Sequence, residues 1–346
     1  MNGHRFSKLV ALSLLVVTAL AACAAPTTPT ATAPTPAAAA EASGKISLYT
    51  SVPQPIADKI QADFQSRFPK VTLDIFRGGT SAVVAKIMTE KAAGEIIADL
   101  VWVAEPSTYE DFKAQDLLLK YTPPEASALP AEMKDKDGYY YAGRLINMVI
   151  VYNTAAEPKP KSWKDLLNPA YKGKIGFPSP LNSGAAEGAV KTLADDPSFG
   201  WKYFEDLKAN GAKQVENNST LRDQIASGEF QVGALLDYMV RQVKPKGAPI
   251  DMVWPEEGAV FIPSPIAILK TTKNPVAAKA FLDFVLSKTG QETMVKLGYF
   301  IPVRPDVTPP EGAPTLDKIK RLPTDWQAVA RDRQATKDKW NALFGK

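Results

Sequence analysis

The sequence predicts an α/β protein of two lobes, each a mostly parallel sheet flanked by helices, with a ligand cleft between the lobes. Short apolar segments typical of strands alternate with longer segments of helical periodicity, which is the pattern of a doubly wound sheet. The alternation occurs twice, and two longer apolar segments, 144–152 and 260–269, separate and follow the second set. The chain has 346 residues, which is more than a single core normally accommodates.

The first set of elements lies between residues 46 and 115. Ile56, Ile60 and Phe64 recur at a spacing of four, so they share one face of a helix. Ser81 is a suitable N-cap for the helix that follows. The expected strands are 46–49, 71–76 and 99–103, and the expected helices are 55–68, 81–91 and 107–115.

The second set lies between residues 174 and 236. The expected strands are 174–177 and 231–236, a short segment 213–216 leads into a helix, and the expected helices are 183–193, 199–209 and 219–226. A helix at 275–286 and an amphipathic helix at 324–344 complete the chain.

The two long apolar segments are expected to be strands that cross between the lobes and form the hinge. Pro263 and Pro265 interrupt the second of these segments. The first lobe is then expected to contain residues 45–148 and 264–300, and the second lobe residues 149–263 and 301–346.

The N-terminal segment predicts export and a membrane anchor. A basic start and an apolar run at 9–20, too short for a comfortable bilayer span, are typical of a signal peptide at 1–22. The run ends in Leu20-Ala21-Ala22-Cys23, which resembles a bacterial lipobox in which the cysteine becomes the lipidated N-terminus. An ordinary signal peptide with a chance cysteine is the alternative. Residues 23–44 are rich in Ala, Pro and Thr and are expected to form a tether.

Composition excludes several classes of function. The chain has 41 Lys and Arg against 37 Asp and Glu, with no long basic run, so no nucleic-acid groove is expected. Its single cysteine is Cys23, which excludes an internal disulfide and a cysteine-ligated metal centre. Its single histidine, His4, lies in the expected signal peptide. A mature chain would therefore lack histidine-dependent catalysis and histidine-ligated metals.

Polar residues follow several expected strands, at the turns that open helices. Ligands of open α/β sheets bind at the carboxyl ends of strands, and free N–H groups at helix N-termini suit an anion. Each serine alone is explained equally well as a helix cap, so the argument depends on several such turns meeting at one edge. The candidate ligand-binding residues are Ser51, Thr80, Ser81, Glu105, Asn182, Ser183, Gly184, Asn218, Ser219, Asp237 and Tyr238.

Four segments carry a resemblance to a known family: ISLYT at 46–50, ADLVW at 98–102, VYNT at 151–154 and GEFQVG at 228–233. With the lipobox and tether, they resemble a bacterial extracellular solute-binding protein of an ABC importer, and in particular the ferric-binding-protein-like branch, which includes binders of phosphonates and sugar phosphates. The resemblance implies a type II-like periplasmic-binding-protein fold whose lobes close on a ligand. It implies a binding protein without enzymatic activity or cofactor, with a membrane permease and its ATPase as partners.

We therefore expect an extracytoplasmic monomer, at the cell surface or in the periplasm, anchored through a lipid on Cys23. The family's iron binders hold Fe(III) with a histidine, a glutamate and two adjacent tyrosines beside a bound anion. Here the mature chain has no histidine, the tyrosine pair reads Tyr238-Met239, and Glu105 is displaced by a residue. The family's anion site is better matched, by Ser183-Gly184-Ala185 and by Asn218 and Ser219.

The expected ligand is accordingly a small phosphorus oxyanion: a phosphonate such as 2-aminoethylphosphonate, or a phosphate ester. Hydroxyls and backbone N–H groups would bind its oxygens, Glu105 or Asp237 would pair with an ammonium group, and Tyr238 would cover the ligand. Arg77 and Arg144 are also candidate charge partners, although surface salt bridges are the expected role of both.

The sequence is also compatible with other functions. The main alternative is Fe(III) import, with Glu105 and Tyr238 as metal ligands. A polyamine or thiamine-like cation could be enclosed by Tyr49, Trp102 and Tyr238. An enzyme without histidine and a purely structural surface lipoprotein are further classes, but the chain has no Ser-x-x-Lys or Gly-x-Ser-x-Gly motif.

Overall fold

A computed structural model describes residues 42–345. The expected signal peptide, lipobox and most of the tether lie outside the described residues. Within residues 42–345, no helix is long and apolar enough to cross a bilayer.

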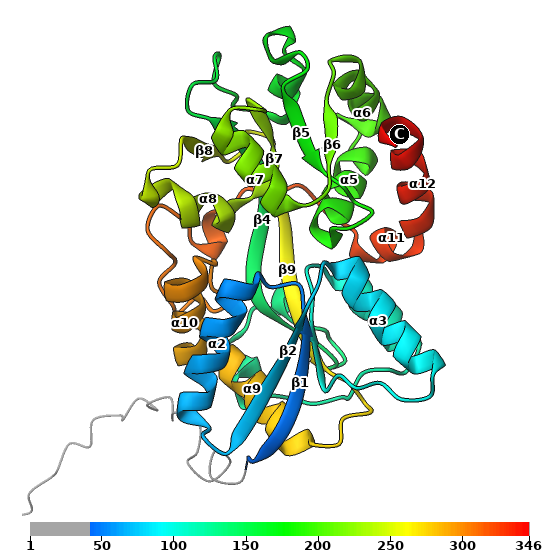
Figure 1. Ribbon diagram of the computed structural model, residues 1–346, viewed down its shortest axis with the longest axis vertical. Coiled ribbons are helices and arrows are strands. Elements are labelled where there is room, and N and C mark those ends of the chain that lie inside the picture. The colour runs from blue at the N-terminus through cyan, green and yellow to red at the C-terminus, as the bar shows by residue number, and fades with distance from the viewer. Residues whose placement is uncertain (1–41, 346) are drawn as a thin grey trace, which may run out of the picture. The chain divides into compact units, whose positions relative to one another are not determined.

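A single nine-stranded sheet runs through this part of the chain, and helices cover both of its faces (Figure 1). Its strand order is β2-β1-β3-β9-β4-β7-β5-β6, and β8 pairs with β4 off this path. The strands are β1 Gly44–Thr50, β2 Val71–Arg77, β3 Leu100–Trp102, β4 Tyr141–Asn153, β5 Ile175–Pro178, β6 Lys213–Val215, β7 Val232–Leu236, β8 Ile250–Val253 and β9 Val260–Ile268.

The helices lie close to the ranges that the sequence predicts, with three differences. They are α2 Gln54–Arg67, α3 Thr80–Ala92, α4 Pro106–Ala114, α5 Gly184–Asp195, α6 Gly200–Ala209, α7 Asn218–Ser227, α8 Asp237–Val243, α9 Pro275–Leu286, α10 Lys288–Gly298, α11 Trp326–Arg331 and α12 Arg333–Phe344. Short 3₁₀ helices are η1 Pro124–Ala128, η2 Ala131–Met133, η3 Trp163–Leu167, η4 Pro169–Tyr171, η5 Lys244–Lys246 and η6 Leu316–Lys318. The sequence did not predict α8, α10 or β8, and the expected single helix at 324–344 is divided at Asp332 into α11 and α12.

Two parallel groups of strands flank a central antiparallel pair. β1 pairs parallel with β2 and β3, and β5 pairs parallel with β6 and β7. We call residues 44–114, which hold β1–β3 and α2–α4, the first half, and residues 175–236, which hold β5–β7 and α5–α7, the second half. Between them, β4 and β9 pair antiparallel with each other, and β4 also pairs with β7.

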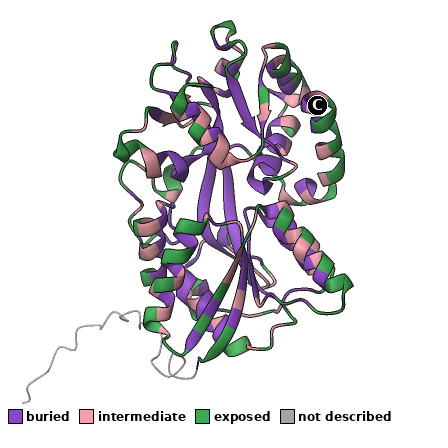
Figure 2. Cartoon of the chain, viewed as in Figure 1, coloured by how far each residue is buried: buried purple, intermediate pink, exposed green. Residues whose placement is uncertain are grey.

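The long apolar run of β4 is explained by its burial. All but one of its thirteen residues are buried, because helices and loops cover both faces of the central strands (Figure 2). In the first half, side chains alternate between the two faces. Leu48 and Trp102 pack with α2 and α9 in one core cluster, whereas Tyr49 and Val101 pack with α3 and α4 in another.

The two prolines in β9 lie where β3 and β9 separate. β3 pairs with β9 only from Ile266 onwards, so Pro263 and Pro265 precede that ladder. The Tyr109 hydroxyl fills the gap, since it accepts a hydrogen bond from the backbone N–H of Val103 at 2.9 Å and donates to the carbonyl of Pro265. A proline is tolerated at these positions of β9 because β3 does not pair with β9 there, so no hydrogen bond from its backbone nitrogen to β3 is needed.

Candidate functional site

The turns that follow β1, β2, β5 and β6 meet at a small cavity between the two halves. The cavity has a volume of about 70 Å³, enough for a few water molecules or a small ion. Its lining includes seven of the eleven predicted ligand-binding residues: Ser51, Thr80, Asn182, Ser183, Asn218, Ser219 and Tyr238. Arg77, Gly79, Arg144, Asn217 and Met239 also line it.

Several helices begin at the cavity. The N-caps of α2 and α8, Pro53 and Leu236, line it, and three further helices begin there with a glycine or polar N-cap. Gly79 is the N-cap of α3, Ser183 that of α5 and Asn217 that of α7. The Ser183 hydroxyl accepts a hydrogen bond from the N–H of Ala186 at 3.2 Å and another from the Asn218 side-chain amide at 2.9 Å. The expected capping role of Ser183 is therefore present alongside its position in the cavity. First-turn N–H groups and the helix dipoles give this region a positive potential.

Arg144 is the principal charge at the cavity. It projects from β4, is only 2% exposed, and donates through Nε to Ser264 Oγ at 3.1 Å. Its Nη1 has no hydrogen-bond partner, and no carboxylate within the described residues forms an ion pair with it. Its Cζ lies 4.7 Å from the ring centroid of Phe300 and 5.9 Å from that of Tyr238. Burial lowers the pKa of Arg144 from its usual value.

The expected surface salt bridges of Arg144 and Arg77 are therefore wrong. Arg144 is buried, and Arg77, although exposed, lines the cavity without a carboxylate partner among residues 42–345. The sequence did contain a signal for Arg144: it is a charged residue inside an otherwise apolar strand segment. Such a residue is expensive to bury unless something compensates its charge.

Two polar atoms without hydrogen-bond partners and the Tyr238 hydroxyl also lie at the smaller cavity. Ser51 Oγ and Asn218 Oδ1 are buried and lack hydrogen-bond partners. Burial raises the pKa of Tyr238, against the opposing effect of Arg144 and Arg77. The phenol therefore keeps its proton at neutral pH and is a hydrogen-bond donor.

Four predicted residues do not line the cavity. Ser81 Oγ instead donates to the carbonyl of Leu181 at 2.8 Å, which is a direct bond between the two halves. Asp237 is buried, accepts from the backbone N–H of Asn147 at 2.9 Å, and pairs with Arg241. Gly184 is buried at the start of α5, where it packs against Glu105, the last of these four residues.

Glu105 lies at a contact between the halves rather than in the cavity. Its Oε1 accepts from Thr108 Oγ1 at 2.6 Å, and its Oε2 would lie 1.7 Å from a Cβ at Gly184, so only glycine fits there. Burial raises the pKa of Glu105 to about 7, and the negative charge of Glu187 adds to the effect.

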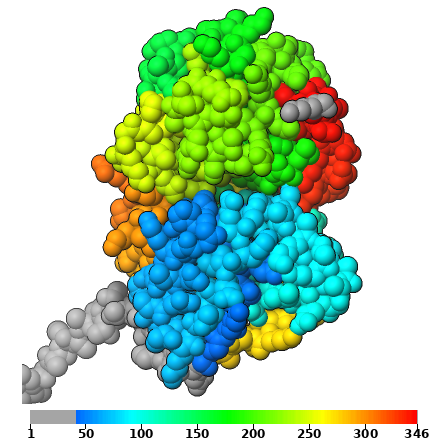
Figure 3. Space-filling view, in the orientation of Figure 1, coloured from blue at the N-terminus to red at the C-terminus, as the bar shows by residue number. Residues whose placement is uncertain are grey.

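The halves are closed over the cavity. A Cβ on Gly79 would come within 2.9 Å of the carbonyl oxygen of Asn182, so the two backbones touch across the site. In the space-filling view, the blue and cyan surface of the first half meets the green surface of the second (Figure 3).

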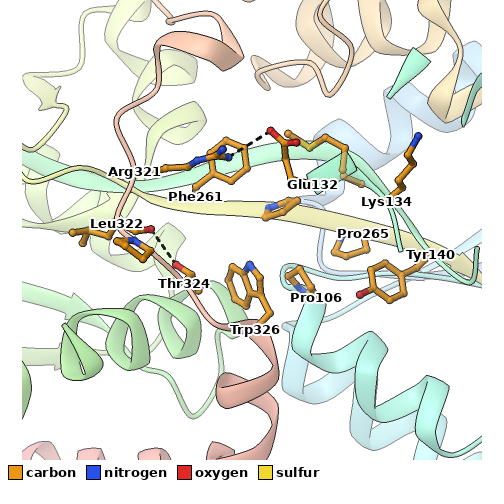
Figure 4. A pocket seen from close by; sticks show the side chains of 14 residues that line it. Pro106, Glu132, Lys134, Tyr140, Phe261, Pro265, Arg321, Leu322, Thr324 and Trp326 are labelled. Carbon is orange, nitrogen blue, oxygen red and sulfur yellow. Dashed lines mark hydrogen bonds and ion pairs between the residues drawn. The ribbon is translucent and has the colours of Figure 1, made fainter. Parts of the chain in front are cut away.

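A second, larger cavity lies on the opposite face of β4 and β9. Phe261 and Pro263 line it, and they pair with Asn147 and Leu145, whose side chains point away from Arg144 and Ile146. Its volume is about 570 Å³, and Trp326, Pro106 and Tyr140 also border it (Figure 4). None of the predicted ligand-binding residues lines this cavity.

No metal cluster is evident at the smaller cavity. Among residues 42–345, no group of three or more His, Cys, Asp or Glu side chains is placed to hold an ion. Of the two residues expected to bind iron, Tyr238 lines the cavity and Glu105 does not.

Residues 95–331 match the model of a protein family described as "Bacterial extracellular solute-binding protein". A Salmonella typhimurium protein named "Putative 2-aminoethylphosphonate-binding periplasmic protein" is 26% identical over 302 residues, which cover 82% of this chain and 87% of that protein. An uncharacterized Haemophilus influenzae protein is 27% identical over 328 residues, covering 87% and 91%.

Solved structures show the same fold. The periplasmic binding protein AfuA from Actinobacillus pleuropneumoniae, with exogenous fructose-6-phosphate bound, has a TM-score of 0.78 and 25% identity, covering 87% of this chain and 98% of that one. Iron-bound HitA from Pseudomonas aeruginosa has a TM-score of 0.75 and 21% identity, covering 85% and 99%. The predicted two-lobed α/β fold of periplasmic binding proteins is thus confirmed. The chain belongs to the bacterial extracellular solute-binding protein family.

Proposed function

We propose that the protein captures a small phosphorus oxyanion in the cavity between its halves and delivers it to the permease of an ABC importer. The observation that carries the proposal is Arg144, a buried guanidinium with a free Nη1 and no carboxylate partner in the described chain. Arg77 and three helix N-termini add positive potential at the same cavity. A dianionic phosphoryl or phosphonyl group compensates this charge.

Relatives support a ligand of this kind. The name of the Salmonella typhimurium protein and the ligand in the AfuA structure share a phosphorus oxyanion, attached to different organic groups. We therefore assign the oxyanion to Arg144, Arg77 and the N-termini of α3, α5 and α7, and the organic group to the region near Tyr238. In this closed arrangement the cavity volume of about 70 Å³ suits the oxyanion group itself.

The ammonium group of an aminophosphonate finds no carboxylate on the cavity wall. Asp237 is engaged by Arg241 and Asn147, and Glu105 packs against Gly184 with a raised pKa. We therefore expect ethylphosphonate, which lacks the ammonium group, to bind about as tightly as 2-aminoethylphosphonate.

Calorimetric titration of the full chain with a ligand panel tests the proposal. The panel contains 2-aminoethylphosphonate, ethylphosphonate, phosphate, a hexose phosphate, Fe(III) citrate, thiamine and spermidine. We expect binding of phosphorus oxyanions, and a loss of about a hundredfold or more in affinity for Arg144→Met, because a charge-assisted contact to the anion is removed. Arg77→Ala should lose less, because Arg77 is exposed.

Arg67→Ala is the matched control, since Arg67 is an exposed residue of the first half that does not line the cavity. Equal affinity of Arg144→Met and Arg67→Ala would contradict the site. Binding of Fe(III) alone, with a phenolate absorption band that Tyr238→Phe removes, would instead establish iron import. Recovery of every ligand chemically unchanged after prolonged incubation is expected of a binding protein, whereas turnover would identify an enzyme.

We also propose that closure joins two lobes, residues 45–148 with 264–300 and residues 149–263 with 301–346, about the strands β4 and β9. Ligand contacts on both lobes favour the closed form. The protein is proposed to act as a monomer outside the cytoplasm, held at the membrane by a lipid on Cys23.

A further inference from the structure

The C-terminal helices touch both halves of the sheet. α12 packs on the second half through Trp340, whose ring centroid lies 5.7 Å from that of Phe177 and 5.5 Å from that of Phe204. α11 packs against α4 of the first half, and Trp326 lies beside Pro106 at the larger cavity (Figure 4). One segment of the chain therefore contacts α4 and the second half at once.

Arg333, at the start of α12, makes polar contacts with both halves. Toward α4, its Nη2 donates to Ser107 Oγ at 3.0 Å and lies 3.3 Å from Asp111 Oδ2. Toward α5, its Nε lies 3.1 Å from Glu187 Oε1, and Lys337 Nζ lies 3.2 Å from the other oxygen of Glu187. The guanidinium thus connects a helix of the first half to a helix of the second.

The contact with Glu187 is shielded from water, whereas the contact with Asp111 is partly exposed. Ser107 and Glu187 are buried, the Arg333 side chain is 21% exposed, and the Asp111 side chain is 42% exposed. Charge pairs in such a setting are screened far less than surface pairs. Separation of α4 from α5 would leave Arg333 with fewer partners on one side, so opening has a specific electrostatic cost here.

The contacts lie next to the oxyanion cavity without forming part of it. Glu187 is one turn after Ser183, the N-cap of α5 that lines the cavity. Ser107 is two residues after Glu105, whose carboxyl group packs against Gly184. Arg333 does not line the cavity, so it can influence a bound ligand only through the placement of α5 against α4.

We propose that Arg333 is a positioning residue for the oxyanion site: it holds α5 against α4 in the closed arrangement and so keeps Ser183 opposite Arg144. The ligand part of this inference rests on the proposed function, whereas the closure part does not. The planar guanidinium reaches Asp111 and Glu187 at the same time, which the point charge of a lysine cannot reproduce. Because affinity scales with the population of the binding-competent form, loss of this contact weakens binding.

The test measures closure and affinity separately in the full chain. Cys23→Ser removes the only native cysteine, so spin labels can be placed at Ala85→Cys on α3 and Glu205→Cys on α6, both exposed. Pulsed electron resonance then reports the distance between the halves, and calorimetry reports the affinity for 2-aminoethylphosphonate. We expect Arg333→Ala to lengthen the distance in the ligand-free protein and to raise the Kd about tenfold. Arg333→Lys should be intermediate.

The matched control is Arg331→Ala, because Arg331 is exposed on α11 and pairs with Asp332 alone among the described ion pairs. It should change neither readout. Asp111→Asn removes one of the two α4 partners without altering α12. It should shift both readouts in the same direction as Arg333→Ala but by less, because Ser107 remains and Asp111 is 42% exposed, and it tests the contact even if Arg333→Ala fails to fold. Unchanged distances and affinity in Asp111→Asn and Arg333→Ala would overturn the inference. A lengthened distance in a protein that binds no phosphorus oxyanion would refute the proposed function and uphold the role of Arg333 in closure.

Discussion

Glu105 is a buried carboxyl group with a titration point close to neutral pH. Its pKa is raised from 4.5 to about 7, chiefly by burial and further by Glu187. Between these values the folded chain holds a proton that the unfolded chain releases, so the free energy of unfolding falls as the pH rises from 4.5 through 7. Stability from this group is complete below pH 4.5 and is lost above pH 7.

Glu105→Gln should remove this pH dependence. We expect the variant to unfold a few degrees higher than the parent at about pH 8.5, and at a similar temperature at about pH 4, since the amide is never charged. Calorimetric scans at the two pH values measure the difference, with exposed Glu229→Gln as the control. A difference of the same size at both pH values would show that packing, not charge, separates Gln from Glu at this position.

Helix α3 starts where the two backbones meet, and its N-cap depends on a glycine for that reason. Gly79 has φ −63° and ψ 160°, which any residue can adopt, so its backbone does not require glycine. Its lack of a Cβ matters only in the closed arrangement, where Asn182 O is 2.9 Å from that position.

Gly79→Ala should therefore impede closure without destabilising the open form. We expect ligand affinity to fall about tenfold and the unfolding temperature of the ligand-free chain to stay within about a degree. Titration calorimetry measures the affinity, and thermal unfolding measures the stability. Gly94→Ala is not a suitable control, because the φ of Gly94 is +95° and any side chain there strains the backbone. Ala82→Gly, also in the first turn of α3 but absent from the cavity wall, provides the comparison. Affinity equal to that of the parent would contradict contact at Gly79.

Elements with a strong local pattern were predictable, and those defined by tertiary contacts were not. The spacing of Ile56, Ile60 and Phe64 predicted α2 because one face of that helix is buried. α8 was missed because it follows β7 directly and is only seven residues long. The C-terminal helix is divided at Asp332, and α11 packs against both α4 and α5, which are contacts that no local pattern encodes.

For the site, turns at strand ends predicted seven lining residues, because parallel strands bring their carboxyl ends to one edge. The role of Glu105 could not be predicted, since its burial and partners depend on how the halves meet, whereas the position of Arg144 inside an apolar strand segment was a signal that went unused. That these residues bind the ligand stays a prediction, which the titrations test.

For the whole molecule, anchoring is the prediction to test. In a bacterium that processes lipoproteins, the chain should be recovered with membranes and incorporate labelled palmitate. Cys23→Ser should abolish both, because a thioether-linked diacylglycerol requires the thiol. Equal labelling of parent and variant would place any lipid elsewhere.

The continuity of the sheet through β4 and β9 has a mechanical consequence. β4 and β9 pair from Tyr141 to Met148 of β4, with one register shift between Ala142 and Arg144. Paired strands bend by a small change in twist at each residue rather than by rotation at a single pivot. In the closure proposed above, we expect the change in conformation to be distributed over many backbone torsions of these two strands. A single substitution to glycine or proline in β4 or β9 would therefore change the stiffness of the connection between the lobes without preventing closure.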